Sequence, residues 1–91
     1  MRRIRARVTG RVQGVGFRYF TASAGRALGL AGFVRNEPDG SVVVEAEGPP
    51  GAIEQLLEHL RRGPGLARVA HVAVEDIPPV GDRGPFDVER S

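Results

Sequence analysis

The pattern that most restricts the fold of this chain is the alternation of apolar and polar residues over residues 3–12. Successive side chains of a strand point to opposite faces, so this alternation predicts a strand with only one buried face. The apolar positions are Ile4, Ala6, Val8 and Val12, and the opposite positions are Arg3, Arg5, Arg7, Thr9 and Arg11. We therefore expect a sheet that is covered on one side.

Helical spacing follows in two places. Residues 18–28 predict a helix that stops at Gly29, a common residue just after a helix end. Its apolar residues at helical spacing are Phe20, Ala24, Ala27 and Leu28. A second helix is expected from Pro49-Pro50 to the Gly63-Pro64-Gly65 break. Its apolar stripe, at spacings i, i+3, i+4 and i+7, consists of Ile53, Leu56, Leu57 and Leu60.

The remaining segments are predicted to be strands. Residues 31–36 and 41–47 form a hairpin around a Glu-Pro-Asp-Gly turn, with Asn36 at its tip. Residues 67–77 are apolar in both parities, which indicates either a bulge or burial on both faces. After a loop from Pro78 to Pro85, residues 86–89 form a short last strand.

This order of elements predicts an α+β fold of the ferredoxin-like, split βαβ type: βαββαβ plus a short fifth strand. In that arrangement an antiparallel sheet carries two helices on one face. The length predicts one domain, residues 1–91. The fold hosts many functions, so the site must decide the activity.

Composition removes several kinds of chemistry. The chain has no cysteine and all 13 of its basic residues are arginine, which excludes disulfides, thiolate nucleophiles, cysteine-bound zinc and catalytic lysines. Its histidines, His59 and His71, are too few for a convergent metal site, so we expect no metal and no cofactor. Without an apolar run of about 18 residues or a signal peptide, we expect a cytoplasmic protein with no membrane partner.

The segment "TGRVQGVGFRYF" at residues 9–20 is the first candidate site. Gly14 and Gly16 allow a sharp turn in which backbone N–H groups face one concavity, and the first N–H groups of the following helix lack internal partners. Such a loop binds anions, most often phosphate. Arg18 opposes the helix dipole unless both share a bound anion. From the residues alone, a purely structural turn beside a solvated arginine remains an alternative.

An RNA-binding module is a second alternative. Residues 13–20 match part of an RNA-recognition strand at Gly14, Gly16, Phe17 and Phe20. The leading basic residue is missing, and the motif belongs on the third strand of that fold, whereas here it follows the first. The arginines of residues 3–11 favour an anionic partner, although a solvated outer sheet face also explains them.

Three stretches resemble the acylphosphatase family. Residues 10–18, "GRVQGVGFR", resemble its signature loop, and residues 32–36 followed by 39–42 resemble its second signature. Residues 86–90 are similar to its closing strand, although Ser91 stands where many members carry an aromatic residue. The resemblance implies the ferredoxin-like fold and hydrolysis of the carboxyl–phosphate bond of acyl phosphates, without a metal or covalent intermediate.

The resemblance also implies roles for particular residues. Arg18 would bind the phosphate, and Asn36 would position the attacking water. The phosphate-binding loop would comprise Gln13, Gly14, Val15, Gly16, Phe17, Arg18 and Tyr19. The partner would be a small acyl phosphate, with inorganic phosphate as product and weak inhibitor, and with no nucleic acid.

These residues suit the reaction. A carboxylate is a good leaving group that needs little help from an acid, so positioning and charge stabilisation suffice. We expect Tyr19, Thr21 and Ser23 to serve the helix surface or its first turn, because no base adjoins their hydroxyls.

The acidic residues of the second helix need no catalytic role. Glu54 and Glu58 are expected to pair with Arg61 and Arg62. A further alternative is a domain from a larger transferase, such as the hydrogenase-maturation carbamoyl transferases. The start at Met1 and the compact end favour a free-standing protein, which we expect to be monomeric.

Overall fold

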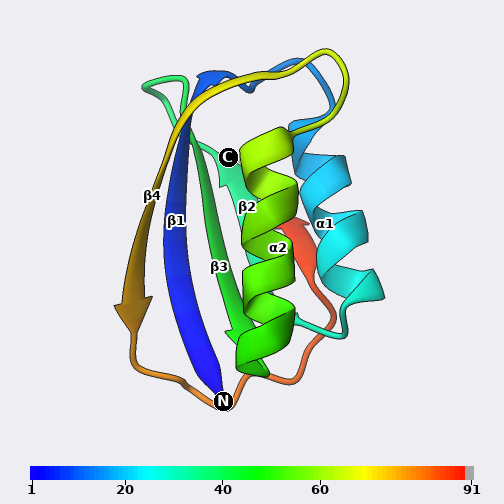
Figure 1. Cartoon of the computed structure of the whole chain (residues 1–91), viewed down its shortest axis with the longest axis vertical. Coiled ribbons are helices and arrows are strands. Elements are labelled where there is room, and N and C mark those ends of the chain that lie inside the picture. The colour runs from blue at the N-terminus through cyan, green and yellow to red at the C-terminus, as the bar shows by residue number, and fades with distance from the viewer. Residues whose placement is uncertain (90–91) are drawn as a thin grey trace.

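The computed structural model describes residues 1–89, and two helices cover one face of a five-stranded sheet (Figure 1). Arg90 and Ser91, which the family resemblance includes at the end of the chain, lie outside the described residues. The elements are β1 (Arg2–Arg11), α1 (Phe17–Ala27), β2 (Ala31–Asn36), β3 (Val42–Gly48), α2 (Pro50–Arg62), β4 (Arg68–Ile77) and β5 (Asp87–Glu89). Every predicted element is present, and at most of the element ends the observed bound differs from the predicted one by a single residue.

The strand order is β4-β1-β3-β2-β5, which confirms the ferredoxin-like α+β fold. β1 pairs antiparallel with β3 and β4, and β3 pairs antiparallel with β2. β5 pairs parallel with β2, so the sheet is mixed rather than wholly antiparallel. The reason is that the chain leaves β4 at one edge of the sheet and adds β5 at the other edge, beside β2.

Both helices form where the sequence patterns predict them, but the predicted apolar face of α1 is wrong. The residues of α1 that are buried are Phe17, Thr21, Ala22 and Gly25, whereas Ala27 is exposed and Phe20, Ala24 and Leu28 are only half-buried. In α2 the apolar stripe is buried against the sheet, with Ile53, Leu56 and Leu60 fully inaccessible. α1 ends in a Schellman motif: the Leu30 N–H donates to the Gly25 carbonyl at 2.9 Å and the Gly29 N–H donates to the Arg26 carbonyl at 3.1 Å. Gly29 has a φ of 70°, the left-handed conformation that this motif requires.

β4 is an edge strand, and most of its side chains are exposed. Its register against β1 shifts between Thr9, opposite His71, and Gly10, opposite Val69. Ala70 is therefore the extra residue of a β-bulge. Of the two interpretations of its pattern, the bulge is confirmed and burial on both faces is wrong, because none of the β4 side chains is buried.

The arginines of β1 are not simply solvated. On the outer face Arg3 is 7 % exposed and lies between the carboxylates of Glu45, at 3.0 Å, and Glu47, at 3.2 Å. Glu47 also accepts hydrogen bonds from the backbone N–H groups of Val80, Gly81 and Asp82. The bond from Val80, followed by those from Arg3 and Gly81, holds the pKa of Glu47 below its ordinary value. The buried carboxylate thereby attaches the 78–85 loop to the sheet.

Candidate active site

The loop that follows β1 turns at two left-handed glycines. Gly14 has a φ of 74° and Gly16 a φ of 81°, and a Cβ added at either position would meet no atom within 4 Å. These glycines are therefore required for their backbone angles and not for lack of space. Val15 between them packs partly against the core, which fixes the middle of the loop.

The loop leads directly into α1 with unoccupied backbone donors. Gly16 is the N-cap and offers no side chain to cap the helix, and its carbonyl accepts the first helical hydrogen bond, from the Phe20 N–H at 3.0 Å. The N–H groups of Phe17, Arg18 and Tyr19 consequently have no acceptor within the helix. No acidic residue occupies the first turn of α1. The helix thus presents donors and positive potential at this end.

Arg18 lies beside the C-terminal end of β5. Its Nη1 donates to the carbonyl oxygen of Glu89 at 3.2 Å. The carboxylate of Glu89 pairs instead with Arg35, at 3.6 Å. Within residues 1–89, Arg18 forms no ion pair, so its charge is available to an anion at the loop.

Asn36 is the last residue of β2 and lies opposite Val42 of β3. The residue is half-buried, in contrast to the exposed hairpin tip expected for a turn asparagine. Its Oδ1 is buried and finds no hydrogen-bond partner within residues 1–89. A buried amide oxygen without a partner is costly, and such an atom usually has a ligand or a bound water to accept from.

Sheet register brings Arg18 and Asn36 to the same end of the sheet. β1 and β2 both run antiparallel to β3, so both finish at this end, although β3 separates them. One strand therefore separates β1 from β2. Glu89, which accepts from Arg18, lies opposite Arg35, and Asn36 is the next residue of β2. Figure 1 shows the β1–α1 loop and the β2–β3 turn at the same end of the molecule.

Gln13 connects the loop to the hairpin that carries Asn36. Its Nε2 donates to the carbonyl oxygens of Glu37, at 2.8 Å, and Ser41, at 2.9 Å. The Glu37 N–H in turn donates to the Ser41 carbonyl at 2.9 Å. The amide nitrogen of Gln13 is thus occupied with the β2–β3 turn and holds the loop against the hairpin.

The turn itself is held by Asp39. The hydroxyl of Ser41 donates to Asp39 Oδ1 at 2.6 Å, and the Ser41 N–H donates to the same oxygen at 2.9 Å. These bonds, with the nearby Arg7 guanidinium at 3.2 Å, lower the pKa of Asp39. The hairpin end next to Asn36 is therefore rigid at neutral pH.

The other predicted loop residues divide by burial. Phe17 is 1 % exposed and belongs to the core, so only its backbone N–H can serve the site. Tyr19 is 64 % exposed and its ring is free of the core. A sequence profile of the acylphosphatase family matches residues 4–88 of this chain.

The chain belongs to the acylphosphatase family. It is 57% identical to an acylphosphatase of Salinibacter ruber over 74 residues, which cover 81% of this chain and 78% of that protein. Among solved structures, an acylphosphatase from Bacillus subtilis superposes with a TM-score of 0.94 at 36% identity, covering 98% of this chain and 99% of that chain. The chain is thus an acylphosphatase enzyme that hydrolyses acyl phosphates.

A larger protein contains the same fold. T. kodakarensis HypF superposes with a TM-score of 0.87 at 34% identity, and the match covers 100% of this chain but 12% of that one. An acylphosphatase-like unit therefore also occurs as a small part of a long chain, which is the form that the transferase alternative describes.

The RNA-binding alternative loses its structural basis in this enzyme. Phe17 and Phe20 pack against each other, with ring centroids 6.1 Å apart, instead of lying on an open sheet face. Three of the arginines of the outer sheet face have carboxylate partners: besides Arg3, Arg5 pairs with Glu45 at 2.9 Å and Arg7 pairs with Asp39.

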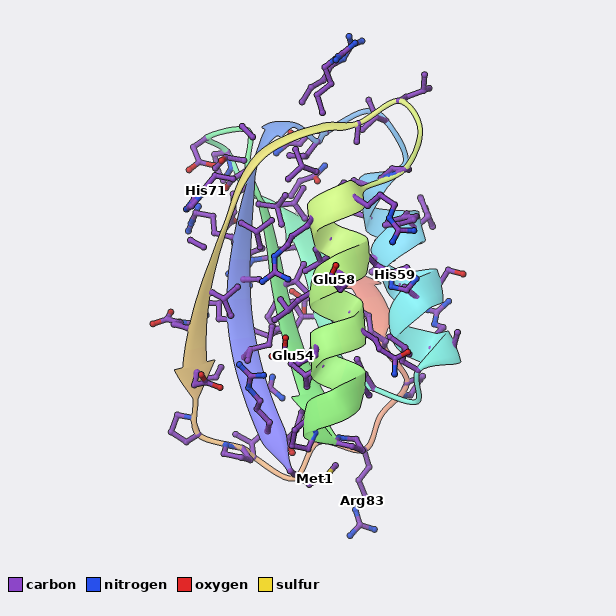
Figure 2. The ribbon with its side chains drawn as sticks, in the orientation of Figure 1. Met1, Glu54, Glu58, His59, His71 and Arg83 are labelled. Carbon is purple, nitrogen blue, oxygen red and sulfur yellow. The ribbon has the colours of Figure 1, made fainter. Side chains whose placement is uncertain are left out.

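The two histidines lie on different elements, as Figure 2 shows. His59, on α2, bonds to the Gln55 carbonyl at 2.8 Å and packs against Phe20, and His71 belongs to β4. Among residues 1–89, no three histidine, aspartate or glutamate side chains gather as a metal site would require. No helix in this part of the chain is long and apolar enough to cross a membrane.

The acidic side chains of α2 have ordinary partners. Glu58 pairs with Arg61 at 3.0 Å, as expected, whereas within residues 1–89 Glu54 pairs with Arg2 at 2.6 Å and with neither predicted arginine. The start of β1 reaches this helix because α2 begins at the end of the sheet where β1 begins (Figure 1).

Thr21 is the residue whose environment the sequence concealed. It was expected on the helix surface or as a cap, but it is fully buried, and its Oγ1 finds no partner within residues 1–89. Thr21 and Asn36 thus hold the two buried side-chain atoms of this kind in the described residues. The signal that could have found it is helical spacing, because Thr21 lies four residues after Phe17 and four before Gly25, which are buried as well.

Proposed function

We propose that the enzyme cleaves the carboxyl–phosphate bond by direct attack of a positioned water, with Arg18 and the loop amides as the phosphate site. The observation that supports this most strongly is the buried, unpartnered Oδ1 of Asn36 at the end of the sheet where Arg18 lies. An amide oxygen accepts a hydrogen bond, so it can hold one O–H of a water and direct the water's lone pair at phosphorus.

The phosphate group would lie on the free N–H groups of residues 14–19, at the N-terminus of α1. Arg18 can leave its single bond to the Glu89 carbonyl and bind two phosphate oxygens with its planar guanidinium. Charge spreading over the equatorial oxygens of the transition state is then matched by the helix end and by the arginine.

The bond changes balance without another group. The water oxygen forms a bond to phosphorus while the bond between phosphorus and the acyl oxygen breaks, and its electron pair leaves with the carboxylate. One water proton passes to a phosphate oxygen of the substrate, because the amide of Asn36 cannot take it. The products are a carboxylate and inorganic phosphate.

Stereochemistry at phosphorus tests the direct displacement. The measurement uses a chiral, isotopically labelled phosphorothioate analogue of benzoyl phosphate, hydrolysed in labelled water. A single displacement inverts the configuration. Retention would instead require a phosphoryl-enzyme intermediate and would refute the proposal.

Inorganic phosphate, as the product, is proposed to bind the same site weakly and to inhibit. We also propose that the enzyme is a cytoplasmic monomer of one domain. Light scattering after gel filtration of the 91-residue chain tests the monomer, since a mass near twice 9.7 kDa would contradict it.

A further inference from the structure

Two arginines at the site end of the sheet face each other without carboxylate partners. Arg11 of β1 lies directly opposite Arg68 of β4. Within residues 1–89 neither forms an ion pair, whereas the β1 residues Arg2, Arg3, Arg5 and Arg7 each do. Like charges directly opposite one another across two strands are destabilising, so this pair needs an explanation.

The two arginines border a hollow beside the phosphate loop. It has a volume of about 370 Å³, and Gly14 and Val15 of the loop form one wall. Leu66, which is 76 % exposed, also lines the hollow. Figure 1 shows the α2–β4 connection crossing the same end of the molecule as the β1–α1 loop. The hollow thus combines an apolar side chain with two free cations.

The in-line geometry of phosphoryl transfer directs the acyl group toward this hollow. Attacking and leaving oxygens lie on opposite sides of phosphorus. Asn36 approaches from β2, and β1 and β4 lie on the other side of β3. A leaving acyl group therefore points away from β2, toward the sheet edge that carries Arg11 and Arg68.

We propose that Arg11 and Arg68 form an acyl subsite that selects acyl phosphates whose acyl group bears a second anionic group. The proposal rests on the proposed function, because it uses the positions assigned to the phosphate and the water. The carbon skeleton lies against Leu66, and the second anion is bound between the two guanidinium groups, which relieves their mutual repulsion.

The test compares two substrates, benzoyl phosphate and 4-carboxybenzoyl phosphate, in the wild type and in Arg11→Gln and Arg68→Gln. Each variant should lower kcat/KM for the carboxylated substrate about tenfold, chiefly through KM, and leave benzoyl phosphate unchanged. A benzoyl phosphate with a second phosphate on the ring should show the same loss of kcat/KM if the subsite accepts any anion. If kcat/KM is unchanged for both anionic substrates, the proposal is overturned.

Arg83→Gln is the matched control. Arg83 is exposed, forms no ion pair within residues 1–89 and lies at the opposite end of the molecule in Figure 2. The Arg83→Gln substitution removes the same charge as Arg68→Gln. Equal losses of kcat/KM for the carboxylated substrate in the two variants would therefore show general attraction of anions and overturn the subsite. Equal losses for both substrates in Arg68→Gln would overturn it as well.

Thermal unfolding without ligand distinguishes a binding role from a structural one. Removing one of two opposed charges should leave the Tm of Arg68→Gln at or above that of the wild type. A lowered Tm would show that the pair supports the fold. Failure of the proposed function would be seen separately, in Arg18→Ala. That variant would then retain turnover of benzoyl phosphate, whatever the ratio of kcat/KM for the two substrates in the Arg11 and Arg68 variants.

Discussion

Replacing Gly16 with alanine isolates the contribution of the loop's backbone angles. A Cβ at this position meets no atom within 4 Å, so the only direct cost is the left-handed φ of 81°. That conformation costs a non-glycine residue about 1–2 kcal/mol. For a domain of this size, the loss corresponds to a fall in Tm of about 4–16 °C.

Gly29→Ala is the control, because Gly29 ends the same helix with a φ of 70° and equal free space. Both variants should lose similar stability in urea or thermal unfolding. Only Gly16→Ala should lose activity, by about 100-fold in kcat/KM for benzoyl phosphate, because its strain is relieved by moving the N–H groups that bind phosphate. Full activity in Gly16→Ala, or an equal loss of activity in Gly29→Ala, would refute the reasoning.

Three further predictions concern charge and metal. Arg18→Lys should raise the Ki for inorganic phosphate at least about tenfold, because an ammonium cannot bind two oxygens as the planar guanidinium does; an unchanged Ki would contradict this. The lowered pKa of Glu47 means that its stabilisation is present above the ordinary glutamate pKa and is lost as pH falls through the folded value. Tm should therefore fall as the pH drops below the ordinary glutamate pKa, and it should fall less steeply in Glu47→Gln. Phosphate release from benzoyl phosphate should not change with EDTA, whereas restoration of lost activity by a divalent cation would oppose the mechanism.

Much of the fold is written in local patterns. The alternation of residues 3–12 predicts β1, and the stripe of α2 is buried as its spacing requires. The direction of β5 was not predictable, because a three-residue strand carries no information about its partner. The exposure of β4 follows from its place at the edge, which its apolar composition does not reveal.

The site shows the same division between local and long-range information. Two glycines and an arginine before a helix predict the anion loop from chemistry alone, and the family resemblance adds Asn36. The bonds from Gln13 to the β2–β3 turn join residues 24 and 28 positions apart, and no spacing rule anticipates them. The burial of Thr21 likewise depends on how α1 packs on the sheet.

The division of labour between Arg18 and Asn36 is the central claim, and thermal protection by inorganic phosphate, measured beside turnover, tests it most directly. A ligand at about 100 times its Kd raises the unfolding free energy by about 2.7 kcal/mol. Phosphate at that multiple of the wild-type Kd should protect the wild type and Asn36→Ala equally, while Asn36→Ala loses most of its turnover. Arg18→Ala should lose both protection and turnover. Wild-type turnover in Asn36→Ala, or its loss of protection by phosphate, would contradict the account.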